Sequence, residues 1–389
     1  MPLLAVAVFV EPWEVGMTAF AHIVGWGMSL PQRVMTNDDW AKLVDTSDEW
    51  IRSRTGVSER RFAGEGETTL TMSMEAARQA LEVAGLSPAN LDLIIVATAT
   101  PEHIFPSTAC LLQDGLGAIH AGAFDLSAGC SGFVYGLAMA ADSIRAGSSQ
   151  NALVIGAETM SRIINMEDRG TAVLFGDGAG AAVVSGSAVP GGILSTVLGS
   201  DGSGGDYLII PAGGSKLPAS AETVAQNLHT IRMNGREVYK FATRIMDKAV
   251  REACRRADLP LEDINLVVPH QANDRIIQVA ARNLGLPMES FFLNLDRYGN
   301  TSAATIPIAL CEAIQAGRIH RGDRVAMVGF GAGLTWAAAV LQWELPLPLT
   351  PPKWWRRWLH GLYYVWAKLH SWGLRLQRKL MSFFSRDTE

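Results

Sequence analysis

One α/β pattern occurs twice in this chain, and it constrains the possible folds more than any other feature of the sequence. Residues 91–117 read LDLIIVATATPEHIFPSTACLLQDGLG, and residues 264–285 read INLVVPHQANDRIIQVAARNLG. Each run gives a buried strand, a turn, a helix and a closing glycine in the same order. Residues 175–185 (FGDGAGAAVVS) and 329–341 (GFGAGLTWAAAVL) likewise share a glycine-rich turn that leads into a small-residue strand.

This repetition predicts two copies of one α/β unit that meet at a pseudo-twofold axis, where a site could form on the seam. A chance likeness between ordinary α/β segments is the alternative, but the shared order of elements favours duplication. We expect an N-terminal half over 17–190 and a C-terminal half over 191–345.

Other segments of the body, from His22 onward, are also typical of an α/β protein. Residues 91–100 and 151–158 are short β-rich apolar runs, as in strands that are buried on both faces. The pattern predicts a helix over 68–86 that is closed by Gly85. A helix over 131–147 is apolar on nearly every side, so we expect it at the centre of the molecule, ending at Gly147.

Composition excludes several classes of protein. With 389 residues, of which 48% are hydrophobic, the chain can build a large core. A net charge of −5 gives no sign of nucleic-acid binding. The four cysteines are far apart and form no C-x-x-C pair, which argues against a zinc site and a disulfide framework. We expect reduced thiols in a cytosolic protein.

The two ends differ from the body. Residues 1–16 begin with an apolar run but lack the basic segment and the cleavage site of a signal peptide. We expect them to be a loosely attached extension, or to precede the natural first residue, Met17. Residues 346–389 combine a Pro-rich linker with a basic tail that holds five of the eleven tryptophans.

The tail has the spacing of an amphipathic helix. Residues 353–389 carry eight Lys and Arg against two Asp and Glu, which leaves a net charge of −11 on the rest of the chain. The charges are too frequent for a membrane-spanning helix, whereas a basic, Trp-rich face is typical of a helix that lies in an anionic membrane surface. The alternative is an additional helix packed on the body or across an oligomer interface.

The stretch FDLSAGCSGFVYGL (124–137) places Cys130 where an apolar strand is expected to become an apolar helix. The helix dipole and free backbone N–H groups at such a position favour a thiolate. The small neighbours Gly129, Ser131 and Gly132 leave room for a substrate. A small buried hydrophobic residue is the alternative, so Cys130 needs partners elsewhere to be a convincing nucleophile.

Three other segments supply such partners. VVPHQAN (267–273) puts His270 and Asn273 just past a buried strand, and DRYGNTSAA (296–304) holds Asn300 in a turn. Alone, His270 would more often be a core residue, and Asn300 an N-cap. The loop GFGAGLTW (329–336) offers backbone N–H groups for an oxyanion. Each signal is weak by itself, but the four together predict nucleophilic catalysis.

From His22 to Leu345 the chain resembles β-ketoacyl-acyl carrier protein synthase III of the thiolase superfamily. The motifs that carry this resemblance include DTSDEWIRSRTGVSERR (45–61), HIFPSTACLLQ (103–113), DRGTAVLFGDGAGAA (168–182), PHQAN, DRYGNTSAA and GFGAGLTW. The resemblance implies the five-layered αβαβα thiolase fold, usually a homodimer, and an acyltransferase that needs no metal or redox cofactor.

The resemblance also implies a reaction, a decarboxylating Claisen condensation that initiates fatty-acid synthesis. Cys130 takes the acyl group from acyl-CoA, and His270 and Asn300 donate hydrogen bonds to the thioester carbonyl of malonyl-acyl carrier protein. The N–H groups of Cys130, Ala332 and Gly333 hold the acyl-enzyme oxyanion. The family's loop is usually Gly-Gly-Gly-Phe, whereas this chain has Ala and Leu at its second and fourth positions, which changes the expected shape of the pocket.

Further site residues follow from the same resemblance. The expected CoA-binding residues are Trp50, Arg54, Arg169, Gly170, Asn273 and Arg275. Trp50 would stack on adenine and the arginines would bind phosphates. The alternative for Trp50 is an aromatic residue of the core, and the alternative for Arg169 is a surface ion pair with Asp168. Phe105 and Leu334 are expected at the acyl pocket, Phe105 closing that of the partner subunit; simple packing is the alternative for Phe105.

A basic helix is the expected docking site for the acidic carrier protein. Residues 236–256 carry Lys or Arg every three or four residues, and we expect docking at Lys240, Arg244, Arg275 and Arg282. A solvated charged face is the alternative.

Two rival functions stay open. The first is a related Cys-His-Asn enzyme that acts on long-chain or secondary-metabolite acyl groups, and the second is a non-catalytic scaffold tethered to membranes by its tail. The expected location is the cytoplasm, with peripheral contact at the inner face of the membrane.

Overall fold

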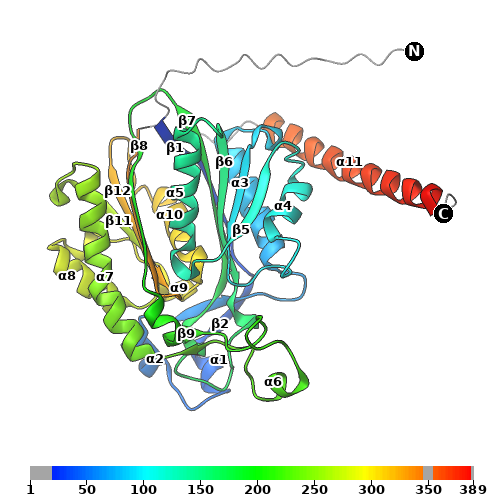
Figure 1. Ribbon diagram of the computed structural model, residues 1–389. Coiled ribbons are helices and arrows are strands. Elements are labelled where there is room, and N and C mark those ends of the chain that lie inside the picture. The colour runs from blue at the N-terminus through cyan, green and yellow to red at the C-terminus, as the bar shows by residue number, and fades with distance from the viewer. Residues whose placement is uncertain (1–19, 345–353, 387–389) are drawn as a thin grey trace.

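The computed structural model describes residues 20–344 and 354–386, whose main elements form five layers (Figure 1). Two β-sheets enclose a central helical layer, and other helices cover the outer face of each sheet. The central helices are α5 (Gly132–Arg145) and α10 (Thr305–Gln315); α3 (Thr69–Ala84) and α4 (Thr108–Leu116) cover the first sheet, and α7 (Gly235–Arg256) and α8 (Asp274–Leu284) cover the second. The expected αβαβα order is confirmed.

The two sheets share one topology. The first has the order β1 (Phe20–Ser29), β7 (Asp177–Ser187), β6 (Asn151–Thr159), β4 (Leu93–Ala97) and β5 (Gly122–Leu126). The second has the order β8 (Gly192–Ser200), β13 (Thr335–Gln342), β12 (Arg324–Gly331) and β11 (Leu266–Pro269). In the first sheet, β4 is parallel to β6, β6 is antiparallel to β7, and β7 is antiparallel to β1. The second sheet repeats this order: β11 is parallel to β12, β12 is antiparallel to β13, and β13 is antiparallel to β8.

The two copies predicted from the sequence therefore correspond to two sheets with the same strand order. The boundary expected at residue 190 lies in the loop between β7 and β8, and it stays a prediction.

Shorter elements gather at one end of the molecule (Figure 1). They are β2 (Arg33–Thr36), α1 (Asn37–Ala41), α2 (Asp48–Thr55), β3 (Glu59–Phe62), β9 (Leu208–Ile209), α6 (Ala221–Ala225), β10 (Arg232–Met233) and α9 (Leu295–Tyr298). Several of them wall the candidate site described below.

Local sequence signals explain where helices begin and end. The side chain of Thr68 accepts a hydrogen bond from the N–H of Thr71 at the start of α3, and Gly85 ends this helix with a φ of 64°. Helix α5 is apolar on nearly every side because both sheets contact it: Phe133 and Leu137 belong to one buried cluster with residues of both sheets. Burial of each such side chain contributes about 1.5–3 kcal/mol.

Helix α11 (Trp354–Arg386) contacts α4 through one side and extends beyond the body (Figure 1). Tyr363 donates a hydrogen bond to the carbonyl oxygen of Gly117 at 2.7 Å, and Arg375 pairs with Asp114 at 2.6 Å. Ala367, between them on the same face, is buried. The tail therefore packs on the body, as one of the two alternatives predicted.

The opposite face of α11 is apolar and faces away from the body. Val365, Leu369, Trp372 and Leu376 are all exposed, and their spacing places them on the side opposite Ala367. Of the helices in the described ranges, none is long and apolar enough to cross a membrane. The predicted extension over 1–16 and the linker after residue 345 lie outside the described residues.

Candidate active site

Cys130 lies in a short 3-10 turn, Gly129–Ser131, between β5 and α5. It is 7% exposed. The end of β12 packs directly against this turn, since a Cβ atom on Gly331 would lie 2.4 Å from the backbone nitrogen of Cys130. Gly129 has a φ of 53°, a conformation that glycine adopts at no steric cost. These glycines allow the two halves to meet at the thiol.

Burial raises the pKa of the Cys130 thiol to about 12, although the contact of its Sγ atom with Ser302 Oγ at 3.5 Å acts in the opposite direction. Burial thus acts against the thiolate that the helix dipole was expected to favour. Helix α5 begins two residues after Cys130, at Gly132.

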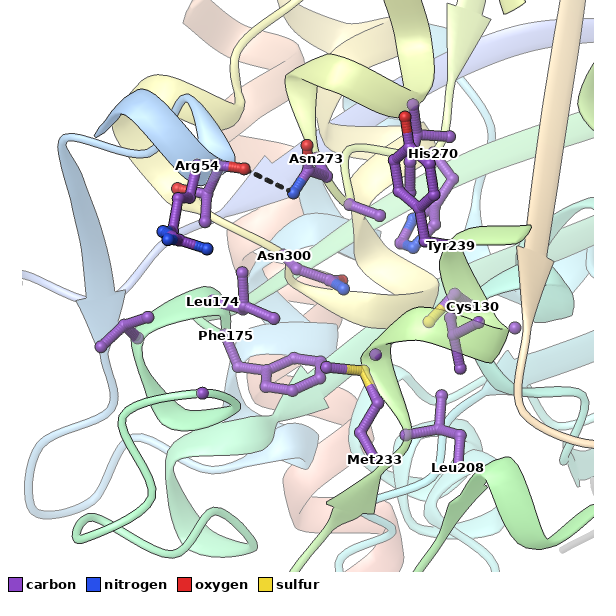
Figure 2. Close-up of a pocket in the computed structure, with 18 of the residues that line it drawn as sticks. Arg54, Cys130, Leu174, Phe175, Leu208, Met233, Tyr239, His270, Asn273 and Asn300 are labelled. Atoms are coloured by element: carbon purple, nitrogen blue, oxygen red, sulfur yellow. Dashed lines mark hydrogen bonds between the residues drawn. The ribbon is translucent and has the colours of Figure 1, made fainter. Parts of the chain in front are cut away.

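His270 and Asn300 come from the other half of the chain and reach the same cavity as Cys130 (Figure 2). His270 follows β11, is fully buried, and lies with Nδ1 2.7 Å from Thr305 Oγ1. Burial lowers the pKa of the imidazole to about 3, so the ring is uncharged at neutral pH. The Oδ1 atom of Asn300 accepts a hydrogen bond from the N–H of Ser302 at 2.8 Å, and its amide extends into the cavity.

Two cavities meet at the thiol of Cys130. The larger, of about 380 Å³, holds His270 and Asn300 and opens between α2 and the start of α7. The smaller, of about 200 Å³, has almost entirely apolar walls, among them Met160, Phe175 and Ile210. A group bound to Cys130 can therefore place a hydrocarbon part in one cavity while a second molecule enters through the other.

Most of the expected CoA-binding residues surround the larger cavity. Trp50, Arg54, Gly170 and Asn273 line it, and the guanidinium groups of Arg54 and Arg169 lie 4.9 Å and 5.2 Å from the ring centre of Trp50. Arg169 also pairs with Asp45, not with Asp168. These contacts place two cations beside an accessible indole, as recognition of a nucleotide would require.

Asn273 and Arg275 have structural contacts as well. Asn273 Nδ2 donates to the carbonyl oxygen of Arg54 at 3.0 Å (Figure 2). Arg275 donates to the carbonyl oxygen of Ser53 at 2.6 Å, and the two bonds hold α2 against α8. A groove next to the larger cavity is lined by four cationic side chains: Arg54, Arg236, Lys240 and Arg275. Such a groove suits phosphate groups.

The remaining expected residues lie in varied surroundings. Arg244 and Arg282 are exposed on α7 and α8, and Lys240 pairs with Glu237 at 2.7 Å. Ala332 lines the smaller cavity. Gly333 is not among the residues that line either cavity. The roles of all these residues stay predictions.

The two residues expected at the acyl pocket lie apart from both cavities that reach Cys130. Leu334 is buried in the cluster beneath α7, where it packs against Gly204. Phe105 is 86% exposed on the loop before α4. A role for Phe105 therefore depends on a second subunit.

Sequence reasoning missed several residues that the structure brings to the site. Tyr239 and Met233 line the larger cavity, and Ser302, Thr305 and Glu158 form the hydrogen-bonded surroundings of Cys130 and His270. The hydroxyl groups that follow Asn300 in NTSAAT were the only signal available. Within residues 20–344 and 354–386, no three His, Cys, Asp or Glu side chains are grouped to hold a metal ion.

Comparisons with known proteins agree with this geometry. Family models described as 3-oxoacyl-[acyl-carrier-protein] synthase III and its C-terminal domain match residues 124–202 and 254–343. A β-ketoacyl-[acyl-carrier-protein] synthase III from Caldanaerobacter subterraneus is 56% identical over 324 residues, which cover 83% of this chain and 98% of the relative. One from Clostridioides difficile is 54% identical over 329 residues, 85% of this chain and 100% of the relative.

Solved structures give the same result. The crystal structure of 3-oxoacyl-[acyl-carrier-protein] synthase III from Aquifex aeolicus matches with a TM-score of 0.77 and 49% identity, covering 83% of this chain and 99% of that one. OleA from Xanthomonas campestris, at 21% identity and a TM-score of 0.73, covers 84% of this chain and 99% of its own, and shares the fold alone. The chain belongs to the β-ketoacyl-[acyl-carrier-protein] synthase III family of condensing acyltransferases.

Proposed function

We propose that this protein joins an acyl-CoA primer to malonyl-acyl carrier protein, with loss of carbon dioxide, to give a 3-oxoacyl-acyl carrier protein and so initiate fatty-acid synthesis. Family membership supports the reaction. The observation that carries the residue roles is the meeting of Cys130, His270 and Asn300 in one cavity.

In the first half-reaction, the sulfur of Cys130 attacks the thioester carbonyl of acyl-CoA. The backbone N–H of Cys130 and those of the loop at Ala332 and Gly333 stabilise the oxyanion, and the CoA thiolate leaves. The apolar cavity of about 200 Å³ receives the hydrocarbon part of the acyl group. Its modest volume favours a short primer over the long chains of the rival condensing enzymes.

In the second half-reaction, malonyl-acyl carrier protein loses carbon dioxide to form an enolate. His270 and Asn300 donate hydrogen bonds to the thioester oxygen on which the negative charge develops. The uncharged imidazole of His270 suits a donor role, because its proton is not needed elsewhere in this step. The enolate carbon attacks the acyl thioester, and Cys130 leaves. These steps require oxyanion stabilisation and proton transfer, which backbone and side-chain groups can supply, so we propose that no cofactor takes part.

CoA and the phosphopantetheine arm of the carrier protein would enter by the same route. Trp50 and the arginines beside it recognise the nucleotide, and the cationic groove with Lys240 and Arg275 receives phosphates. The exposed Arg244 and Arg282 extend the positive surface along α7 and α8 for an acidic carrier protein.

Acylation of Cys130 tests this function. The protein is incubated with short, branched and long acyl-CoAs, and its intact mass is measured beside that of Cys130→Ala. We expect a single acyl adduct that is absent from the variant, with the short primers reacting fastest. Absence of an adduct from every donor would favour the scaffold, and preference for long chains would favour the long-chain rival.

We also propose that the enzyme is cytoplasmic and that α11 binds an anionic lipid surface. One face of α11 is already held by the body, so its outward apolar face needs another partner. That face carries Trp372, and Lys368 and Lys379 lie beside it, the combination that suits acidic headgroups above a hydrocarbon layer.

Vesicle binding tests the role of α11. The double variant Leu369→Ser/Trp372→Ser should bind vesicles of anionic phospholipid at least about 100-fold more weakly, because each lost side chain removes roughly 1.5–3 kcal/mol of burial. Leu43→Ser, at a leucine of the body that is 55% exposed against 63% for Leu369, is the control and should bind as the wild type does. Equal binding by both variants would contradict the proposal.

A further inference from the structure

A chain of hydrogen bonds links the thiol of Cys130 to a buried carboxyl group that the reaction above does not use. The Sγ atom of Cys130 lies 3.5 Å from Ser302 Oγ, and Ser302 Oγ donates to Glu158 Oε1 at 2.9 Å. Glu158 is on β6, Ser302 follows Asn300, and Cys130 precedes α5, so three distant segments build this chain. Glu158 has no exposed surface.

The other neighbours of Glu158 fix its state. The N–H of Ala99 donates to both carboxylate oxygens, and the hydroxyl groups of Thr98 and Thr100 donate to Oε2, Thr100 at 2.6 Å. When Glu158 is ionised, it can accept a hydrogen bond from all of these donors, which oppose the effect of burial on its pKa. Because the Ser302 proton is directed to Glu158, the lone pairs of its oxygen are left to accept the thiol proton of Cys130.

The backbone of Ser302 has a strained conformation. Its φ of 49° lies in the left-handed region, which residues with a side chain seldom adopt. Backbone strain of this kind persists where the surroundings impose it, and it is concentrated at functional sites. This backbone strain is a second observation, independent of the hydrogen bonds, that indicates a role for Ser302 in the active site.

We propose that Ser302 and Glu158 accept the proton of Cys130 when the thiol attacks, and return it when Cys130 leaves. In the first half-reaction the S–H proton moves to Ser302 Oγ while the Ser302 proton moves to Glu158, the sulfur bonds to the acyl carbon, and the CoA thiolate departs and takes a proton from water. In the second, the enolate carbon bonds to the acyl carbon, the C–S bond breaks, and the proton returns from Glu158 through Ser302 to the sulfur. This inference rests on the proposed nucleophilic role of Cys130.

The free protein needs such an acceptor. Because burial raises the pKa of the Cys130 thiol to about 12, the thiolate is a minor form of the free protein at pH 7. Burial raises the pKa of Glu158, which makes this carboxylate a stronger base than an exposed one. The groups that donate to Glu158 from β4 and from the turn at Ser302 are hydroxyl and amide groups, which do not titrate. The charge of Glu158 acts on the thiol of Cys130, and His270 is uncharged above about pH 4.

Alkylation by iodoacetamide tests the relay without CoA. The rate at Cys130 is followed by peptide mass spectrometry between about pH 5 and pH 9, which separates it from the exposed Cys110. The variants are Glu158→Gln, which keeps the shape but cannot take a proton, and Ser302→Ala. Asp177→Asn is the matched control, a second buried carboxyl group bonded to Ser161 and Ala63.

We expect the wild-type rate to rise as Glu158 loses its proton and then to level off. Both variants should react at least about 100-fold more slowly at pH 7, with a rate that increases tenfold per pH unit, and the control should follow the wild type. Wild-type profiles in both variants would overturn the relay. So would faster alkylation of Glu158→Gln, the result expected if the carboxylate only repels a thiolate.

Two points keep the test decisive. If Glu158→Gln fails to fold, Ser302→Ala alone decides, because it removes the bridge and leaves the carboxylate. The acyl adduct of the wild type is measured in parallel: its absence would contradict the proposed function, whereas the alkylation profile bears on the relay alone.

Discussion

At His270 the position of one proton decides what the imidazole can do. The hydroxyl of Thr305 lies 2.7 Å from Nδ1 and 3.0 Å from the carbonyl oxygen of Ser302, and it has a single proton to donate. If Nδ1 receives that proton, Nε2 carries the ring proton and can donate to a substrate; otherwise Nε2 can only accept. The proposed role of His270 requires the first arrangement, which makes Thr305 a positioning residue.

Replacing Thr305 should therefore affect one half-reaction. In Thr305→Val we expect decarboxylation of the malonyl substrate to slow by about 10- to 100-fold, the cost of a lost buried hydrogen bond, while acyl-CoA still acylates Cys130 at nearly the normal rate. Thr305→Ser keeps the hydroxyl and should restore carbon dioxide release. Carbon dioxide release and adduct formation are measured side by side. Equal slowing of both steps would show a general distortion of the site instead.

The buried imidazole also makes stability depend on pH. The pKa of His270 is about 3 in the folded protein against 6.5 for an ordinary histidine. As the pH falls below about 6.5, the unfolded chain binds a proton that the folded protein does not, so the free energy of unfolding decreases. At pH 5 this loss is about 2 kcal/mol relative to neutral pH.

Urea unfolding at the two pH values measures this effect. His270→Asn removes the titrating group, so its unfolding free energy should decrease by about 2 kcal/mol less than that of the wild type. Parallel decreases in both proteins would mean that His270 is protonated in the folded state as well.

At the scale of elements, local patterns determined what could be predicted. The helix over 68–86 and its end at Gly85 could be predicted from the capping residues and the apolar periodicity. The strand–helix repeat could be predicted because both copies have their elements in the same order. The protonation state of Cys130 could not be predicted from the sequence. It depends on β12 and on the turn at Ser302 packing over the thiol, and contacts between segments so distant in the chain leave no periodic signal.

Helix α11 contacts the body mainly through α4. Its ion pair joins side chains that are 68% and 43% exposed, worth less than about 1 kcal/mol. Ala367 is the buried apolar residue of its described part. We therefore expect its backbone amides to exchange with deuterium much faster than those of α3, and anionic vesicles to slow this exchange. Equally slow exchange in the two helices without lipid would show that α11 is part of the stable body.

At the scale of the whole molecule, the first half has an open sheet edge that is joined to an exposed apolar loop. Strand β5 is an edge strand, paired to β4 alone among the described strands. The carboxylate of Asp125 on β5 accepts from the N–H groups of Thr108 and Ala109, which ties the edge to the loop that carries Ile104 and Phe105. Those two side chains are 88% and 86% exposed. An open sheet edge beside bare hydrophobic residues is typical of a protein interface.

We expect this surface to join two copies of the chain, with Phe105 contributing to the acyl pocket of the partner. Light scattering should give twice the 41.9 kDa of one chain. Ile104→Asp/Phe105→Asp should give the mass of one chain, because two charges cannot be buried at the interface without partners. Leu43→Asp, at an exposed leucine elsewhere, should remain a dimer. Removal of residues 354–389 should leave the mass doubled as well; if this deletion yields monomers instead, the outward face of α11 meets a second copy and not a lipid surface.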